Sequence, residues 1–298
     1  MEAEQRNWGR WGEEDEIGSL NLITPDVVKA ATRSVRTGKV YTLGIPIQSS
    51  GVPLFVEYRG TPMRLTLTNE SDEENFVWMG APVGTGTNED MLVFASHTTS
   101  HIDALSHVYY DKLHYNGVPA RQMKTKAGAQ KLGVEKVRGI VARAVLVDVA
   151  GYFNVKWLEP GQQVSGDELA ACARSQGVEI RAGDLVLIRT GYLDYWFANN
   201  PDVGFSQPGI GIDAARWLAE RDIVAVGSDN AAVEAMPFDA GDLFPVHKML
   251  LVDRGIYMME YLNLTDMAND HCFEGLITVA PLKITGAAGS PVNPIVIG

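Results

Sequence analysis

The sequence predicts an α/β fold in which a buried sheet packs against helices. Apolar runs of strand length alternate with segments of helical periodicity, and this alternation is typical of α/β proteins. The chain has 298 residues, 46% of them hydrophobic, so it can bury a large core and does not need disulfide bonds or bound metal ions to stabilise its fold. No repeat and no proline- or serine-rich linker divides it, so we expect a single domain over residues 1–298. The clearest strands are expected at 139–149, 184–189, 223–228 and 249–253.

Helix boundaries are marked by capping residues. Thr24 followed by Pro25 is a favourable start for a first helix, because threonine accepts a bond from a free backbone N–H and proline suits the first turn. Ser165 followed by Glu168 matches a capping box and predicts another helix. A third helix is expected over 212–221 from its apolar periodicity.

The first hundred residues contain further strands and two irregular segments. Residues 1–20 are polar but carry two tryptophans, so we expect an N-terminal docking arm that packs on its own domain or on a neighbouring subunit. Strands are expected at 40–47, 63–68 and 91–95. The glycine-bearing stretch 69–88 is typical of a surface loop or of an active-site lid.

Charge and cysteine content exclude several classes of protein. The net charge is −12 and the pI about 4.9, so phosphate backbones and anionic membranes would be repelled, and neither is expected as a partner. Cys172 and Cys272 are too few for a disulfide scaffold. No signal-like segment and no apolar run of about 18 residues occurs, so we expect a cytoplasmic protein.

Three of the six histidines fall in one short motif. His97, His101 and His107 flank Asp103, and such clustering favours a metal or catalytic site over scattered surface histidines. On a straight strand His97 and His101 would lie about 13 Å apart, too far for one ion. The chain is therefore expected to fold back after 91–95, so that two imidazoles and a carboxylate meet around Zn²⁺, Mn²⁺ or Fe²⁺. His107 is either a fourth ligand or a free base beside the metal-bound water.

A second pair of candidate ligands lies near the C-terminus. Glu260 is flanked by apolar residues, where an unpaired charge is costly, and His247 precedes it by thirteen positions. A metal ion or a histidinium nearby would relieve that cost.

The motif His97-x-x-Ser-His101-x-Asp103-x-x-x-His107 resembles the signature of the cyclase superfamily, which includes metal-dependent kynurenine formamidases and isatin hydrolase. The resemblance extends to Gly227-Ser-Asp229 and Gly289-Ser-Pro-Val-Asn293. It implies a cyclase-type β/β/α barrel-like sheet surrounded by helices, assembled as a homodimer or homotetramer.

The resemblance also implies roles for the candidate residues. His97, His101 and Asp103 correspond to the first-metal ligands, and His107 to the catalytic acid/base. His247 and Glu260 correspond to the second-metal ligands of the dinuclear zinc formamidases, whereas other members hold one manganese ion. One or two divalent ions, Zn²⁺ or Mn²⁺, are therefore expected.

These expectations point to a metal-dependent hydrolase that opens an amide, a cyclic imide or lactam, or a lactone bond. A metal-activated water would attack, and His107 would transfer the proton. The substrate is expected to be a small molecule, and aromatic residues near the motif suit a flat one. Two alternatives remain open: a non-haem iron oxygenase that uses the His97, His101 and Asp103 triad, and a non-catalytic metal-binding protein. The sequence assigns no role to His114 or His271.

Overall fold

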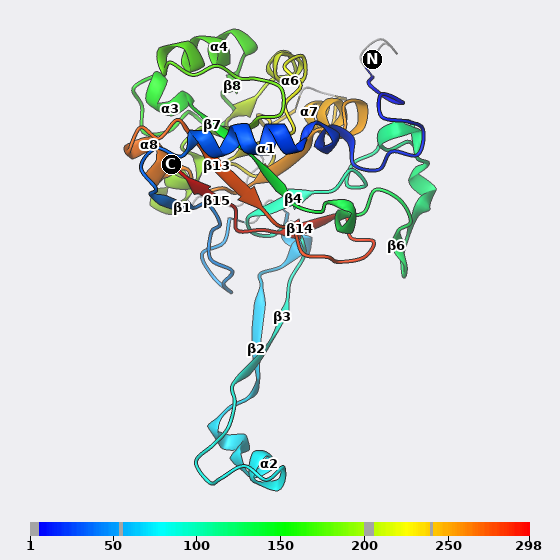
Figure 1. Ribbon diagram of the computed structural model, residues 1–298, viewed down its shortest axis with the longest axis vertical. Coiled ribbons are helices and arrows are strands. Elements are labelled where there is room, and N and C mark those ends of the chain that lie inside the picture. Colours follow the sequence, from blue (N-terminus) through cyan, green and yellow to red (C-terminus); the bar gives the residue numbers. More distant parts are fainter. Residues whose placement is uncertain (1–5, 54–55, 200–205, 239–240) are drawn as a thin grey trace.

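The computed structural model describes residues 6–53, 56–199, 206–238 and 241–298, and its centre is a nine-stranded mixed sheet (Figure 1). The strands are β1 (Val40–Thr42), β4 (His101–Asp103), β7 (Ile140–Asp148), β9 (Leu185–Arg189), β11 (Ala225–Ser228), β12 (Tyr257–Glu260), β13 (Glu274–Val279), β14 (Gly289–Pro291) and β15 (Ile295–Ile297). They lie side by side in the order β1-β15-β13-β7-β9-β11-β12-β4-β14.

The four central strands, β7, β9, β11 and β12, run parallel to one another. Nearly all of their residues are buried, as is typical of parallel strands covered on both faces. The flanking strands β13 and β4 pair antiparallel with β7 and β12. Glu260 is the last residue of β12, so it lies at the edge of the sheet where the parallel strands end.

The sheet curls into an open half-barrel. Gly44, just after β1, forms a bridge with Leu262, just after β12, and the Asn263 N–H donates to the Leu43 carbonyl at 2.7 Å. Because β1 and β12 stand six places apart in the sheet, these contacts require strong curvature. The prediction of an α/β fold with a barrel-like sheet is thus confirmed.

Helices surround this sheet. They are α1 (Pro25–Ala31), α3 (Val149–Tyr152), α4 (Gly166–Ser175), α5 (Tyr192–Asn199), α6 (Ile212–Ala219), α7 (Pro245–His247) and α8 (Thr265–Asn269). Helix α1 packs on β7, and α4 packs on both β7 and α6. The Thr24 side chain accepts from the Val27 N–H, and Ser165 and Glu168 form a complete capping box, so both predicted helix starts are confirmed.

The predicted strand at 249–253 is wrong. The chain continues from α7 into a π-helix over Lys248–Asp253, and the strand that pairs with β11 is β12, a few residues later. Every residue from Met249 to Asp253 is buried. A segment that is apolar on all sides has no periodicity that separates a helix from a strand.

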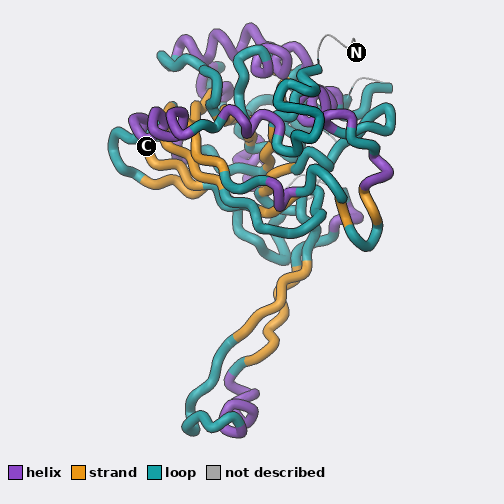
Figure 2. The backbone as a smooth tube through the Cα atoms, turned by 45° about the vertical axis from the view of Figure 1, so that its right-hand side comes forward, coloured by secondary structure: helices purple, strands orange, loops and turns teal. Residues whose placement is uncertain are grey.

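Residues 63–93 form a hairpin that projects far from the body of the molecule (Figures 1 and 2). It consists of β2 (Met63–Thr68) and β3 (Glu89–Val93), which pair antiparallel, and a tip that contains α2 (Glu73–Trp78). We call it the projecting hairpin. The strand predicted at 63–68 is confirmed. The stretch 69–88 lies at the far end of the hairpin, so it forms no lid over its own chain.

The short strands β5 (Met123–Lys124) and β6 (Gly128–Ala129) form a second, smaller hairpin, and β8 (Gln163–Val164) pairs with β10 (Gly209–Ile210). Within the described ranges, no helix is long and apolar enough to cross a membrane.

The N-terminal segment contacts the π-helix. The Trp8 indole N–H donates to the Val252 carbonyl at 2.7 Å, and the Arg6 guanidinium donates to Asp253 at 3.1 Å. Of the expected docking arm, residues 1–5 lie outside the described residues.

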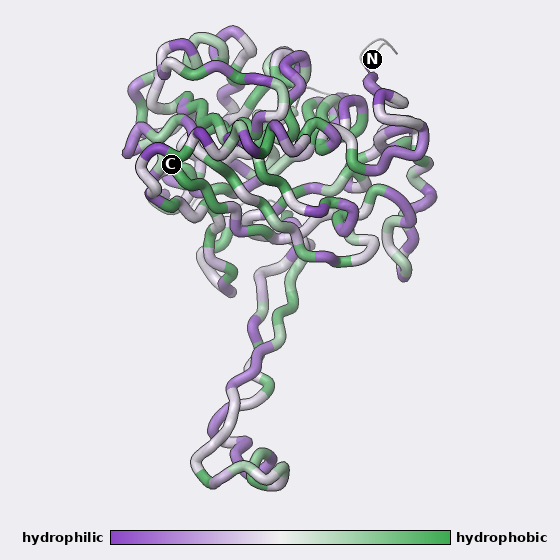
Figure 3. The backbone as a smooth tube through the Cα atoms, in the orientation of Figure 1, coloured by the Kyte–Doolittle hydropathy of each residue, from purple (hydrophilic) through white to green (hydrophobic). Residues whose placement is uncertain are grey.

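The hydropathy of the chain, coloured in Figure 3, shows apolar segments concentrated in the central strands.

Candidate metal centre

The histidine motif surrounds β4. The chain turns at Ser96 and His97 and bends through residues 98–100, as the predicted fold-back requires. His101 and Asp103 are two positions apart on β4 and share one face of the strand. The Nε2 atoms of His97, His101 and His107 lie 3.3, 3.6 and 3.9 Å from Oδ1 of Asp103. The His97 and His107 rings stack at 4.1 Å.

The C-terminal pair joins the same cluster. Glu260 on β12 is directly opposite His101 on β4, and its Oε2 atom lies 3.1 Å from Nε2 of His101. His247, at the end of α7, places its Nε2 atom 3.3 Å from Glu260 Oε1 and 3.7 Å from Asp103 Oδ2. The structure therefore brings all six candidate residues together, with Asp103 at their centre.

Glu234 is a further residue of the site that the sequence pattern did not single out. Its buried carboxylate interacts with Nδ1 of His247 at 2.5 Å and accepts from the backbone N–H groups of Val246 and His247. A carboxylate on the far nitrogen of an imidazole fixes the tautomer that presents the other nitrogen to a metal. Glu234, like Glu260, is a glutamate in an apolar stretch, and that was the only available signal.

The residues present fit a divalent cation. Nε2 of His97, Nε2 of His101 and both oxygens of Asp103 are buried and, apart from their close approaches within the cluster, have no hydrogen-bond partner among the described residues. Leaving so many buried polar atoms unsatisfied is costly unless something else binds them. Imidazole nitrogens and carboxylate oxygens are the ligand types that Zn²⁺ and Mn²⁺ accept.

Two overlapping groups could each hold an ion: His97, Asp103 and His107, and His101, Asp103 and Glu260. Asp103 belongs to both, as a bridging ligand would. This grouping places His107 beside His97, so both roles predicted for His107, ligand and free base, are compatible with the geometry.

Burial and charge set the protonation of the cluster. Burial, reinforced by the neighbouring His247, lowers the pKa of His107 to about 3, and burial also holds the pKa of His97 well below its usual value. Both imidazoles are thus neutral, the form that binds metals and accepts protons. Burial opposes protonation of His247 too, but Glu234 and Glu260 raise its pKa to about 10. A cation bound between these carboxylates would take the place of that proton.

The cluster is open on one side. The His97 and His107 side chains are 13% and 24% exposed, whereas His101, His247 and Asp103 are fully buried. A small molecule would therefore approach from the side of the stacked rings.

The aromatic residues that flank the motif do not gather around this opening within one chain. Phe76 and Trp78 lie on the projecting hairpin. The Tyr110 hydroxyl interacts with Arg6 and Asp253, which ties it to the N-terminal segment. Tyr109 is exposed and packs edge-on against His114.

His114 and His271 lie outside the cluster. Nδ1 of His114 is 3.0 Å from the Val108 carbonyl, and His271 packs against Phe273. Among the described residues, neither histidine belongs to a group that could hold an ion, so the structure adds no role for them.

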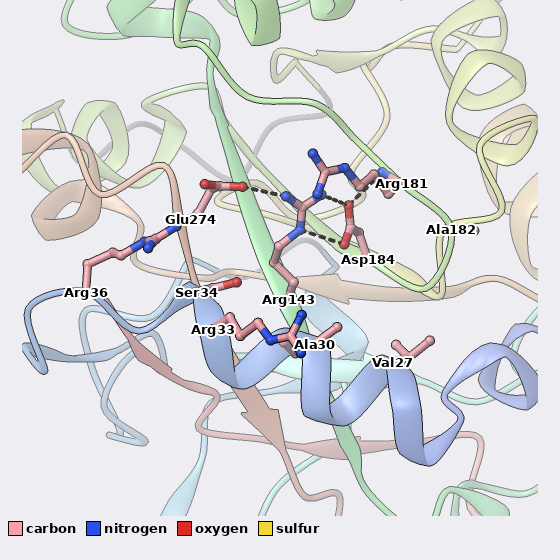
Figure 4. Close-up of a pocket in the computed structure, with 11 residues that line it drawn as sticks. Val27, Ala30, Arg33, Ser34, Arg36, Arg143, Arg181, Ala182, Asp184 and Glu274 are labelled. Atoms are coloured by element: carbon pink, nitrogen blue, oxygen red, sulfur yellow. Dashed lines mark hydrogen bonds and ion pairs between the residues drawn. The ribbon is translucent and has the colours of Figure 1, made fainter.

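An arginine-lined pocket between α1 and β7 is also separate from the cluster (Figure 4). Arg143 at its centre is fully engaged, because it donates to Asp184, Glu274 and the Glu179 carbonyl. Asp184 precedes β9, at the opposite end of the sheet from Glu260. We interpret the charged residues of this pocket as ion pairs that stabilise the fold.

Gly289 provides a test of the geometry around His97. It lies on β14 opposite Asp103, and a Cβ atom there would be 2.4 Å from Nε2 of His97. We expect Gly289→Ala to displace the His97 ring and to weaken metal binding about 10–100-fold, as is typical when a ligand loses its support. Calorimetric titration with Zn²⁺ or Mn²⁺ measures the change. Gly86→Ala is the control, because its Cβ would make only ordinary contacts; equal affinities in the two variants would contradict the arrangement.

The protein is therefore an α/β protein with a candidate metal centre. The centre is a buried histidine–carboxylate cluster, and it lies where the parallel strands of the curled sheet end. The family described as "Putative cyclase" matches residues 41–235, which is more than half of the chain, and the chain belongs to that family. The match covers the histidine motif and Glu234 but ends before His247 and Glu260.

Individual relatives agree with this assignment. Cyclase-like protein 2 of Arabidopsis thaliana is 28% identical over 81% of this chain and 78% of its own length. A crystal structure described as a novel cyclase is 33% identical, with a TM-score of 0.89 over 98% of this chain and 99% of its own. An isatin hydrolase bound to the product analogue thioisatinate is 21% identical, with a TM-score of 0.62 over 87% of this chain and 91% of its own; that likeness shows the fold alone.

Proposed function

We propose that the protein is a metal-dependent hydrolase that opens an amide, a cyclic imide or lactam, or a lactone bond in a small molecule. The observation that carries the proposal is the buried cluster centred on Asp103, which has unsatisfied ligand atoms inside and two neutral imidazoles at its open side. Relatives of this fold include an isatin hydrolase, whose substrate class is a cyclic amide, and this supports the choice of bond.

His97, His101, Asp103, His247 and Glu260 would hold Zn²⁺ or Mn²⁺. A divalent ion in such a site lowers the pKa of a bound water from ~15.7 towards ~7 and polarises a carbonyl group.

The remaining chemistry belongs to His107. Its neutral ring at the open side can take a proton from the attacking water and return it to the departing nitrogen or oxygen. Glu234 positions His247 through Nδ1, so it supports the site without touching the substrate.

The proposal is tested by metal analysis of the purified protein, followed by an activity screen. N-formyl aryl amines, isatin-like lactams and aryl lactones are suitable substrates, because each opening can be followed with a pH indicator. We expect metal-dependent release of acid from at least one class. Turnover that requires oxygen would instead favour the non-haem iron oxygenase.

The number of ions is a separate prediction. Since Asp103 Oδ1 faces His97 and His101, and Asp103 Oδ2 faces His247, which also contacts Glu260, we propose two ions per chain. His247→Ala should lower the stoichiometry, measured by elemental analysis at saturating metal, from two to one. Glu260→Gln, which is nearly isosteric, should do the same, whereas His271→Ala should leave two. One ion in the wild-type protein, unchanged in His247→Ala, would show that the second site does not exist.

A further inference from the structure

Two buried residues beside the glutamates of the site have a left-handed backbone. Val233, which precedes Glu234, has a φ of 60°, and Tyr261, which follows Glu260, has a φ of 56°. Their side chains are 0% and 1% exposed. For a branched or bulky residue this region of φ is sterically unfavourable, because Cβ crowds the neighbouring carbonyl oxygen. Such strain persists only where the surroundings fix it, and it gathers at functional sites.

Asn230 holds both of these strained residues. It is fully buried. Its Oδ1 atom accepts from the Val233 N–H at 2.7 Å, and its backbone carbonyl accepts from the Tyr261 N–H at 2.9 Å. Its Nδ2 group donates to the Pro208 carbonyl at 2.6 Å, so the side-chain amide has a partner on each side and one defined orientation.

Ser100 holds Tyr261 from the other end of its backbone. The Ser100 hydroxyl donates to the Tyr261 carbonyl at 2.6 Å and accepts from the Ile45 N–H at 2.8 Å. It is 2% exposed. Since both backbone polar groups of Tyr261 are engaged, its left-handed conformation is fixed from two directions.

The two glutamates beside these residues meet on one imidazole. Glu234 lies 2.5 Å from Nδ1 of His247, and Glu260 lies 3.3 Å from Nε2. Glu234 belongs to an irregular segment and Glu260 is the last residue of β12, so regular secondary structure alone does not fix either carboxylate. Contacts of this length are lost when a backbone moves by about 1 Å.

We propose that Asn230 and Ser100 are positioning residues that keep the two glutamates on opposite nitrogens of His247. They act through the backbone of their neighbours rather than as ligands. Ligands that are already in place need not be ordered when an ion binds, so such positioning raises metal affinity. The part of the inference that concerns affinity rests on the proposed metal site. The positioning of Glu234 can be tested without any metal.

Alanine variants separate positioning from general stability. Asn230→Ala and Ser100→Ala each remove a hydrogen bond to one strained residue. Ser19→Ala is the matched control, because the Ser19 hydroxyl is 1% exposed and donates to the Val224 carbonyl at 2.7 Å. Val224 lies just before β11, at the end of the parallel strands opposite to Glu260. Ser100→Ala and Ser19→Ala should therefore lose similar thermal stability, since each loses a buried hydrogen bond to a carbonyl.

The first test uses the metal-free protein. The short bond between His247 Nδ1 and Glu234 should give a low-field proton signal in the NMR spectrum, which is assigned by its loss in His247→Ala. We expect Asn230→Ala to shift this signal to higher field or to abolish it, whereas Ser100→Ala and Ser19→Ala keep it. A wild-type protein without the signal, or an unchanged signal in Asn230→Ala, would overturn the proposal.

The second test is calorimetric titration of the same variants with Zn²⁺. The ion that His247→Ala eliminates should bind about 10–100-fold more weakly in Asn230→Ala and Ser100→Ala, and with wild-type affinity in Ser19→Ala. Equal affinities in Ser100→Ala and Ser19→Ala would overturn the proposal, and this comparison holds even if Asn230→Ala does not fold. A wild-type protein that binds no ion would instead refute the proposed function, while the NMR comparison still decides the role of Asn230.

Discussion

Asp103→Asn is expected to abolish metal binding and, with it, all measurable hydrolysis. Asp103 is fully buried and lies within 3.9 Å of four imidazoles, so both ligand groups contain it. Asparagine has nearly the same shape but offers no negative charge and only one oxygen as a ligand. The fold should persist, and therefore the loss should be specific to the site.

The measurement is thermal unfolding with and without metal. An ion at a hundred times its dissociation constant stabilises the folded state by about 2.7 kcal/mol, which corresponds to roughly 5 °C in a chain of this size. The wild-type protein should show this shift, and excess chelator should remove it together with activity. Asp103→Asn should show no shift. Asp111→Asn is the matched control, because Asp111 is exposed and its φ of 50° suits asparagine. Full activity of the wild-type protein in excess chelator would refute the metal-dependent reaction.

His107→Asn is expected to lower turnover by about 10²–10⁴-fold while the metal content stays at the wild-type level. The range is that of a lost general acid/base, and the neutral ring at the open side of the cluster is placed for this role. Steady-state kinetics on the best substrate from the screen and elemental analysis of the same preparation check both halves of the prediction. His271→Asn should behave as the wild-type protein does. If His107→Asn loses an ion, His107 is a ligand instead.

Local signals in the sequence predicted much of the fold. Alternating residues located β2 at 63–68, and a capping box located the start of α4 after Ser165. Such signals lie within a few residues of one another, so they can be identified without tertiary information. The π-helix after His247 could not be distinguished from a strand, because its residues are buried on all sides.

The sequence predicted part of the candidate site, as it predicted part of the fold. The spacing of His97, His101 and Asp103 required a fold-back around one point, and the structure has it. That Glu260 joins the cluster depends on the pairing of β12 with β4, and His247 comes from α7; local patterns reveal neither arrangement. Glu234 was missed for the same reason, since its partner is thirteen residues away in the sequence. The chemical roles of these residues remain predictions.

The projection of residues 63–93 was also unpredictable. The sequence shows a strand, a polar loop and a second strand, and this pattern is the same whether the hairpin lies on the body or points away from it. Only the three-dimensional arrangement shows that the hairpin leaves the body (Figure 1) and that its apolar side chains are exposed.

The strand order has a consequence for the order in which the chain folds. Strand β4, which carries His101 and Asp103, lies between β12 and β14, and β1 pairs with β15 at the C-terminal end. Strands that are far apart in sequence pair late, because the intervening chain must first be made and closed into a loop. Strands β1 and β4 therefore stay without their sheet partners until β12, β14 and β15 are in place, whereas β2 and β3 can pair with each other early. The cluster around Asp103 is therefore complete only after β12 has paired with β4, so its residues cannot surround an ion before that step.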